Sequence, residues 1–246
     1  MFENYELIYD HHTHTIYSHG KGDISDNVKV ANDKGLKEIA ITDHGPGHHF
    51  YGLDKNKLPE MREKIQKLKT EFPKVNVLLG VEANIVDGGN YLDITMEEFK
   101  DYDMVIAGYH YGVSKGHVFN NYISSHIGFP SGSINALRII NTNMTVGAIY
   151  ENNLEIITHP GDKGYFDIDE IAKACVDNDT MIEINNKHRH LTAEEIKIAA
   201  KYDVKFVVSS DAHRPEFVGS IDGCLMRACE AGLDFDRIVN IRKKYE

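Results

Sequence analysis

Residue types that stabilise secreted or membrane proteins are scarce in this chain. It has 246 residues, no tryptophan and only three cysteines, Cys175, Cys224 and Cys229. No two of them form a CxxC pair, and an odd number of thiols does not complete a disulfide framework. The longest apolar runs, such as Met104–Ala107, are too short to span a bilayer, and the N-terminus lacks a basic region followed by an apolar stretch. We therefore expect a cytoplasmic protein with reduced thiols and no membrane partner.

Positive charge is also in short supply. Lys and Arg total 27 against 38 Asp and Glu, which gives a net charge of −11 with histidine neutral. Proteins that bind duplex nucleic acid normally carry a basic surface, so duplex nucleic acid is not an expected partner. The acidic balance also opposes the binding of an anionic phosphate, unless bound metal cations supply the local positive charge. Histidine, the commonest metal ligand among side chains, is abundant, with 14 residues.

The apolar pattern predicts an α/β protein. Short runs rich in β-branched residues alternate with longer amphipathic segments, which is typical of buried parallel strands joined by helices. The predicted strands are Leu7–Tyr9, Ile39–Thr42, Val75–Val81, Met104–Ala107, Ile156–Thr158, Met181–Ile184 and Phe206–Ser209. The predicted helices are Ser25–Lys34, Leu58–Glu71, Asp169–Asn178, Thr192–Tyr202 and Gly219–Ala231, with capping boxes at Thr95 and Thr192. Seven such units favour a closed or nearly closed barrel formed by a single domain over residues 1–246, with a long irregular stretch at Tyr111–Ser133.

Residues that bind metals follow these strands one after another. The side chains at or just past the strand ends are His12, His14, Asp43, His44, Glu82, His110, His159, Glu183, Asn185, Asn186, Asp211 and His213. In a barrel of parallel strands, the carboxyl ends line one mouth, where functional sites are built. The sequence therefore predicts a metal site at this mouth.

The strongest single motif is Asp10–Thr15, which contains His12 and His14. Residues two apart in a strand point to the same face, so both imidazoles can grip one ion, whereas His11 points away. Glu82 is the only acid at its strand end, and a carboxylate can bridge two ions, which makes it the expected bridging ligand. Two interpretations of Asp43 stay open, as a partner that orients an imidazole or as a helix N-cap.

Together these motifs resemble the PHP (polymerase and histidinol phosphatase) superfamily, and in particular its YcdX-like phosphatase branch. The matching segments occur in order along most of the chain. They are Asp10–Thr15, Ile41–Pro46, Gly80–Ile85, Ile106–His110, Thr158–Gly161, Glu183–Asn186 and Ser210–His213.

The resemblance implies a distorted (β/α)7 barrel, similar to a TIM barrel, with a trinuclear metal site. Carried over by position, the first metal takes His12, His14, Glu82 and Asp211. Glu82 bridges to a second metal that His110 and His159 also hold, and His19, His44 and His213 hold the third. The segment from His14 to His19 is one residue shorter than in the family pattern. Zinc is the expected ion, with manganese and iron as alternatives.

The function that the resemblance implies is hydrolysis of small phosphomonoesters, with a hydroxide bridging two metals as the nucleophile. Glu82, Asp211 and His213 are the expected catalytic residues, and Arg189 and Arg214 are expected to hold the phosphate. A nuclease or phosphodiesterase, a histidinol-phosphate phosphatase, an amidohydrolase-like enzyme and a metal sensor remain as alternatives. The oligomeric state, including a homo-oligomer, and the roles of the other histidines are left open; these are His48, His49, His117, His126, His188 and His190.

Overall fold

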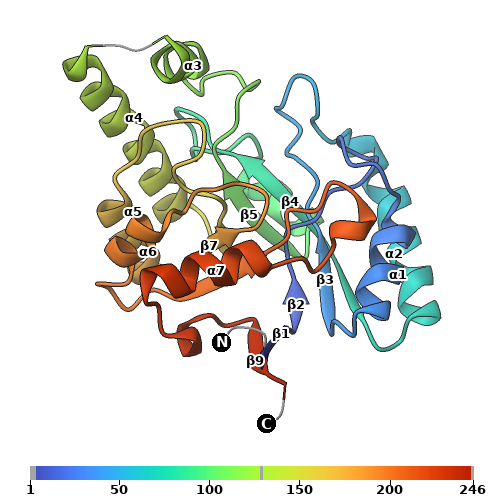
Figure 1. Ribbon diagram of the computed structural model, residues 1–246. Coiled ribbons are helices and arrows are strands. Elements are labelled where there is room, and N and C mark those ends of the chain that lie inside the picture. Colours follow the sequence, from blue (N-terminus) through green and yellow to red (C-terminus); the bar gives the residue numbers. More distant parts are fainter. Residues whose placement is uncertain (1–3, 128–129, 245–246) are drawn as a thin grey trace.

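The core of the protein is a barrel of seven parallel strands. The computed structural model describes residues 4–127 and 130–244. The strands follow one another in chain order around the sheet, each hydrogen-bonded to the next. Their bounds are β2 Tyr9–Asp10, β3 Glu38–Ile41, β4 Asn76–Asn84, β5 Met104–Gly108, β6 Ile156–Ile157, β7 Met181–Asn185 and β8 Phe206–Ser209. This confirms the predicted nearly closed α/β barrel (Figure 1).

The barrel closes between β8 and β2 through local contacts rather than a regular ladder. Thr13 and Ala212 form an isolated parallel bridge, and the His14 N–H donates to the Ala212 carbonyl at 2.8 Å. Next to it, the buried Asp10 carboxylate accepts from the Ser210 hydroxyl at 2.5 Å. These contacts bring the first and last metal-ligand motifs side by side.

One asparagine also joins β8 to β2, the two strands between which the barrel closes. The fully buried Asn240 side chain accepts from the Val208 N–H at 3.0 Å and donates to the Val208 carbonyl at 2.7 Å. It also donates to the Tyr9 carbonyl at 2.9 Å, so a single amide joins β8 to β2. Nothing in the sequence analysis indicated this role.

Helices cover the outside of the barrel. Figure 1 shows α1 and α2 together on one side, and α4, α5 and α6 together on the other. Their bounds are α1 Ile24–Asp33, α2 Leu58–Glu71, α4 Ser131–Glu151, α5 Ile168–Asp177, α6 Ala193–Ala199 and α7 Asp222–Ala231. Both predicted capping boxes are present, at Thr192 before α6 and at Thr95 before the 3₁₀ helix Met96–Asp101.

Two secondary-structure predictions from the sequence were wrong. The first predicted strand, Leu7–Tyr9, is split between β2 and a short strand β1 (Tyr5–Leu7), which pairs antiparallel with β9 (Ile241–Lys243). The predicted irregular stretch Tyr111–Ser133 contains the helix α3 (Val118–His126) and the start of α4, with residues 128–129 outside the described part.

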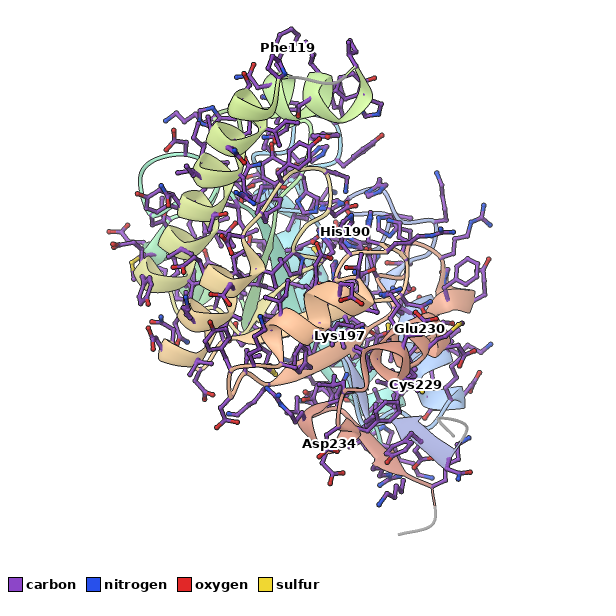
Figure 2. The ribbon with its side chains drawn as sticks, turned by 60° about the vertical axis from the view of Figure 1, so that its left-hand side comes forward. Phe119, His190, Lys197, Cys229, Glu230 and Asp234 are labelled. Carbon is purple, nitrogen blue, oxygen red and sulfur yellow. The ribbon has the colours of Figure 1, made fainter. Side chains whose placement is uncertain are left out.

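Buried polar contacts join α3 to α4. Asn121 of α3 and Asn141 of α4 are both fully buried and donate to one another, at 3.0 Å and 2.8 Å. This amide pair links the two helices, and α4 also buries Leu137, Met144 and Ala148. Figure 2 shows Phe119 of α3 well separated from the exposed Cys229 of α7.

The three cysteines are free thiols, as expected. Within residues 4–127 and 130–244, no helix has both the length and the apolar character needed to cross a membrane.

We predict that Asn240→Ala destabilises the protein by about 3 kcal/mol, because three buried hydrogen bonds are lost and backbone groups are left unpaired. Urea unfolding of the purified protein measures this change. The control Asn56→Ala removes an exposed amide that bonds only to Asp54 locally, so its effect should stay below about 0.5 kcal/mol. Equal effects from both changes would contradict the proposed role of Asn240.

Candidate metal centre

The centre begins at the extended segment that follows β2. His12 and His14 are fully buried and point to the same side, with their Nε2 atoms 3.1 Å apart. His11 points away and its Nε2 lies 2.7 Å from the Glu38 carboxylate, as the alternation of a strand requires.

A first group of donor atoms surrounds these two imidazoles. The Glu82 Oε2 atom lies 3.3 Å from His12 Nε2 and 3.5 Å from His14 Nε2. The Asp211 Oδ1 atom lies 3.3 Å from His14 Nε2 and 3.8 Å from His12 Nε2. Ligands at about 2.0–2.2 Å from a tetrahedral zinc ion are separated by about 3.3–3.6 Å. Three of the measured distances fall in this range, and the other two, 3.1 Å between His12 and His14 and 3.8 Å between His12 and Asp211, lie close to it.

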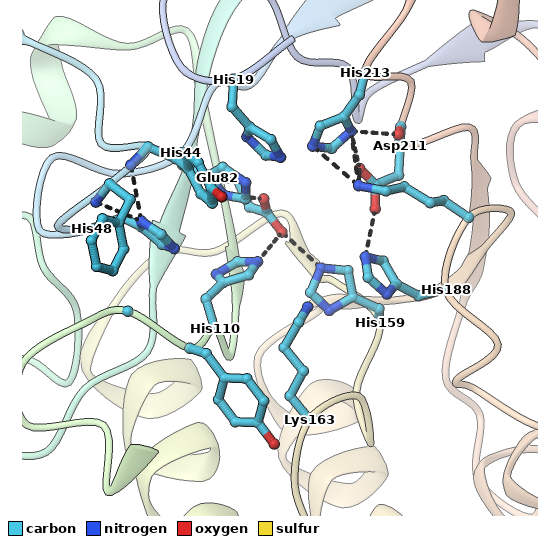
Figure 3. A pocket seen from close by; sticks show the side chains of 15 residues that line it. His19, His44, His48, Glu82, His110, His159, Lys163, His188, Asp211 and His213 are labelled. Atoms are coloured by element: carbon cyan, nitrogen blue, oxygen red, sulfur yellow. Dashed lines mark hydrogen bonds and ion pairs between the residues drawn. The ribbon is translucent and has the colours of Figure 1, made fainter. Parts of the chain in front are cut away.

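A second group forms around the other oxygen of the same carboxylate. Glu82 Oε1 lies 3.2 Å from His110 Nε2 and 2.9 Å from His159 Nε2. Figure 3 shows both imidazoles directed at Glu82. Because its two oxygens face different sets of histidines, Glu82 has the geometry of a bridging ligand.

A third group consists of histidines that follow three different strands. One nitrogen each of His14, His44 and His213 lies within 4.8 Å of the other two. His19 joins this group, since its ring centroid lies 4.1 Å from that of His213 and 4.9 Å from that of His44. The His19 ring stacks on Tyr51 at 4.3 Å, which holds it toward the group despite the shortened segment before it.

Unpaired polar atoms are concentrated in this cluster. Among the described residues, six of the nine predicted ligands have a buried side-chain atom without a hydrogen-bond partner. They are His14 Nδ1, His19 Nδ1, His44 Nδ1, Glu82 Oε2, His159 Nδ1 and Asp211 Oδ1. His44 Nδ1 and Glu82 Oε2 are 3.0 Å apart without hydrogen-bond geometry. Buried polar atoms are normally satisfied, and cations in the cluster would satisfy Glu82 Oε2, Asp211 Oδ1 and His44 Nδ1. His14 and His159 instead face the carboxylates with Nε2, so their Nδ1 atoms lie on the other side of each ring.

The electrostatics of the cluster favour the same occupant. Burial lowers the pKa of His14 and of His110 well below the usual value, and lowers that of His19 to about 3. Burial alone raises the pKa of Glu82 and Asp211, but the surrounding imidazoles hold both well below the usual value. Neutral imidazoles and ionised carboxylates are the forms that ligate metals.

His12 differs from the other imidazoles. Burial lowers its pKa, but the carboxylates of Glu82, Glu183 and Asp211 outweigh burial and raise it well above the usual value. The negative potential of the cluster is therefore strong around His12, where a cation is most stabilised.

A layer of polar residues orients the candidate ligands. The His12 Nδ1–H group donates to Glu183 at 2.7 Å, and the other Glu183 oxygen accepts from the His159 N–H at 2.7 Å. His110 Nδ1 lies 2.9 Å from the Asn84 side-chain oxygen, which leaves its Nε2 free for an ion. The sequence analysis placed Glu183 at the strand end without giving it a role.

Asp43 fits neither interpretation that the sequence left open. Its carboxylate accepts from the Thr15 N–H at 2.7 Å and from the hydroxyls of Thr15 and Ser18, both at 2.5 Å. It therefore fixes the turn that leads to His19, rather than orienting an imidazole or capping a helix.

A cavity of about 340 Å³ opens over the cluster. Two lysines line it: Lys163, whose amine lies beside His159 in Figure 3, and Lys187, whose amine is 3.0 Å from His213 Nδ1 and 3.7 Å from Asp211 Oδ1. The sequence analysis missed both, although each follows a strand-end motif within a few residues. His188 also lines the cavity and contacts Asp211 at 3.3 Å.

The two arginines predicted to hold phosphate lie farther out. Arg189 is exposed and does not line this cavity. Arg214 is also exposed, lies 3.5 Å from Glu216, and lines a neighbouring cavity instead. Their contacts with phosphate stay predictions.

The remaining histidines outside the cluster have local partners. His48 Nδ1 accepts from the Tyr51 N–H at 3.1 Å, and His49 Nε2 lies 3.0 Å from the Ser114 hydroxyl. His117 pairs with Asp87 at 3.0 Å, His126 with the Tyr122 carbonyl at 2.9 Å and His190 with Glu195 at 3.2 Å.

Two family models and several curated proteins match this chain. The family model described as "PHP domain" matches residues 10–187, and one described as "PHP-associated" matches residues 192–221. A relative from Thermoanaerobacter sp., named "probable phosphatase", is 33% identical over 96% of this chain and 91% of its own. The "probable phosphatase YcdX" of Shigella flexneri is 28% identical over 94% of this chain and 89% of its own.

Solved structures share the fold at low identity. A histidinol phosphate phosphatase from Lactococcus lactis, complexed with zinc, L-histidinol and phosphate, has a TM-score of 0.62 at 16% identity and covers 93% of this chain and 95% of that chain. A second structure, from Listeria monocytogenes, has a TM-score of 0.66 at 15% identity over 86% of this chain and 97% of that chain.

We predict that Glu183→Gln weakens zinc binding by about 10–100-fold, because His12 loses the carboxylate that accepts from its Nδ1–H group and keeps its Nε2 turned toward the centre. Competition with a chromophoric zinc chelator measures the affinity. The control Glu155→Gln changes a half-buried glutamate just before β6, which accepts from the Val105 N–H. If both variants bind zinc as the wild type does, Glu183 has no role in the centre.

Proposed function

The chain belongs to the PHP family, and on that premise we propose that it hydrolyses small phosphomonoesters at a centre of three divalent metal ions. It is a metal-dependent phosphatase. The observation that supports the finer proposal is the gathering of buried imidazole nitrogens around the two oxygens of Glu82, at 2.9–3.5 Å. Zinc is the preferred ion because imidazoles dominate the donor set, while the carboxylates also allow manganese or iron.

The proposed ligands divide into three overlapping sets. Glu82 belongs to the first two sets because each of its oxygens faces a different group of imidazoles. The first set is His12, His14, Glu82 and Asp211; the second is Glu82, His110 and His159; the third is His19, His44 and His213. Asp211 and His213 come from the segment that the PHP-associated family model matches, so we propose one domain over residues 1–246.

Bound divalent ions would polarise the phosphoryl oxygens and lower the pKa of water at this site. The residues of the chain bind the phosphate and orient the proposed metal ligands. Lys163 and Lys187 line the cavity above the ligands, where their amines offer charge-assisted hydrogen bonds to a phosphate dianion. Glu183 and Asn84 hold His12 and His110 in place, so the donor groups need no rearrangement when a substrate enters. We propose Glu82, Asp211 and His213 as the catalytic residues that face the phosphate.

We predict that Glu82→Gln removes phosphatase activity by on the order of 10³-fold or more, since a neutral amide cannot hold two cations together. Elemental analysis should show fewer bound metal ions per chain than in the wild type. Circular dichroism reports whether the variant is folded. A folded Glu82→Gln protein with full metal content and full activity would contradict the bridging role.

We also predict that Lys163→Met and Lys187→Met each raise the KM for p-nitrophenyl phosphate about tenfold, because each change removes one cation from the phosphate cavity. Bound metal should stay at the wild-type content, which separates loss of phosphate binding from loss of the centre. Lys205→Met serves as the control, because Lys205 pairs with Asp179 on the surface. An unchanged KM in both cavity variants would show that neither lysine binds the phosphate.

A further inference from the structure

A second cavity, of about 510 Å³, adjoins the metal centre. Its walls include four residues that also line the first cavity, namely His19, Lys187, Asp211 and His213. Beyond them it is lined by Lys21, Asn186, Arg214 and Phe217, among others. We call this second space the side cavity. A phosphate held over the metal ligands would therefore lie next to this second space, with His19, Lys187, Asp211 and His213 along the boundary.

The side cavity has a cationic wall. The Lys21 N–H donates to the His213 carbonyl at 2.8 Å, which fixes the backbone of Lys21 next to a proposed metal ligand. The Lys21 side chain is exposed, and none of the ion pairs found between described residues involves it. Arg214 pairs only with Glu216, at 3.5 Å, and both side chains are more than half exposed. Exposed pairs of this kind are weak, so the guanidinium is available to a stronger anion.

The side cavity also has an apolar wall. The Phe217 side chain is 54% exposed and lines the side cavity together with the cations. Another cavity shares only Lys163 with the first cavity, and it is lined by the acid Glu195 beside Arg138 and His190. The side cavity shares four lining residues with the first cavity, and Asp211 is the one carboxylate among the described residues that line it.

We infer that the side cavity binds the leaving group of the substrate, and that this group carries a second anion on a short carbon frame. The substrate class is thus phosphomonoesters whose alcohol part holds a carboxylate or another phosphate. Arg214 and Lys21 contact that anion, Phe217 packs against the carbon frame, and Lys187 lies between the two anions. This inference rests on the proposed phosphatase function and adds the residues that select the substrate.

Three esters with the same glycerol frame test the inference with the zinc-loaded full chain. They are sn-glycerol 3-phosphate, whose leaving group is neutral, 3-phosphoglycerate, whose leaving group has a carboxylate, and glycerol 1,3-bisphosphate. We expect the wild type to prefer at least one of the two acidic esters, by about tenfold in kcat/KM. Preference for the carboxylate or for the bisphosphate identifies the source of the anion.

In Arg214→Ala this preference should fall about tenfold, mainly through KM, and Arg214→Lys should keep most of it. Lys21→Ala should also lower the preference for the acidic ester. The matched control is Arg242→Ala, because Arg242 is a similarly exposed arginine paired with Glu6 away from both cavities.

The inference would be overturned if the wild type, Arg214→Ala and Lys21→Ala all had the same preference for the acidic ester. A wild type that prefers the neutral ester would also overturn it. Either result includes hydrolysis of sn-glycerol 3-phosphate and therefore leaves the proposed function in place. A metal-loaded wild type that hydrolyses none of the three esters would contradict the proposed function itself.

Discussion

The site depends on one buried carboxylate shared between two groups of histidines. Glu82 is inaccessible to solvent, and four imidazole nitrogens lie within 3.3 Å of its two oxygens, from His12, His44, His110 and His159. A carboxylate in such a position is costly unless cations compensate it. Burial lowers the pKa of His14 and of His110 well below the usual value, so these two imidazoles offer lone pairs rather than positive charge. Bound metal ions satisfy both the carboxylate and the lone pairs.

The closure of the barrel brings the first and last ligand motifs together. The first and last ligand motifs are about two hundred residues apart in the sequence, yet Thr13 and Ala212 form a parallel bridge. The buried Asp10 carboxylate and the Asn240 amide hold the same seam at two levels. Because the seam fixes His12 and His14 relative to Asp211, the stability of the barrel and the geometry of the first donor group are linked.

The sequence predicted the strands and the gathering of the candidate ligands at one mouth of the barrel, because both follow from local patterns. Short β-branched runs mark buried parallel strands, and polar residues directly after them must meet at one mouth. The Asn121–Asn141 pair was missed, because no local pattern shows that two polar residues twenty positions apart meet in the interior. Helix α4 was missed although Leu137, Met144 and Ala148 lie on its buried side. Lys163 and Lys187 were missed for a different reason: lysines in loops are ordinarily solvated, and only the folded chain shows them lining a cavity with the ligands. The arginines were chosen by chemical type, and the structure places Arg214 at the side cavity.

The most direct test of the account is the metal content of the purified protein, paired with hydrolysis of p-nitrophenyl phosphate before and after chelation. The three proposed ligand sets predict about three divalent ions per chain, with activity lost on chelation and restored by zinc or manganese. A protein with one metal ion or none, and no hydrolysis with any added divalent ion, would contradict the account.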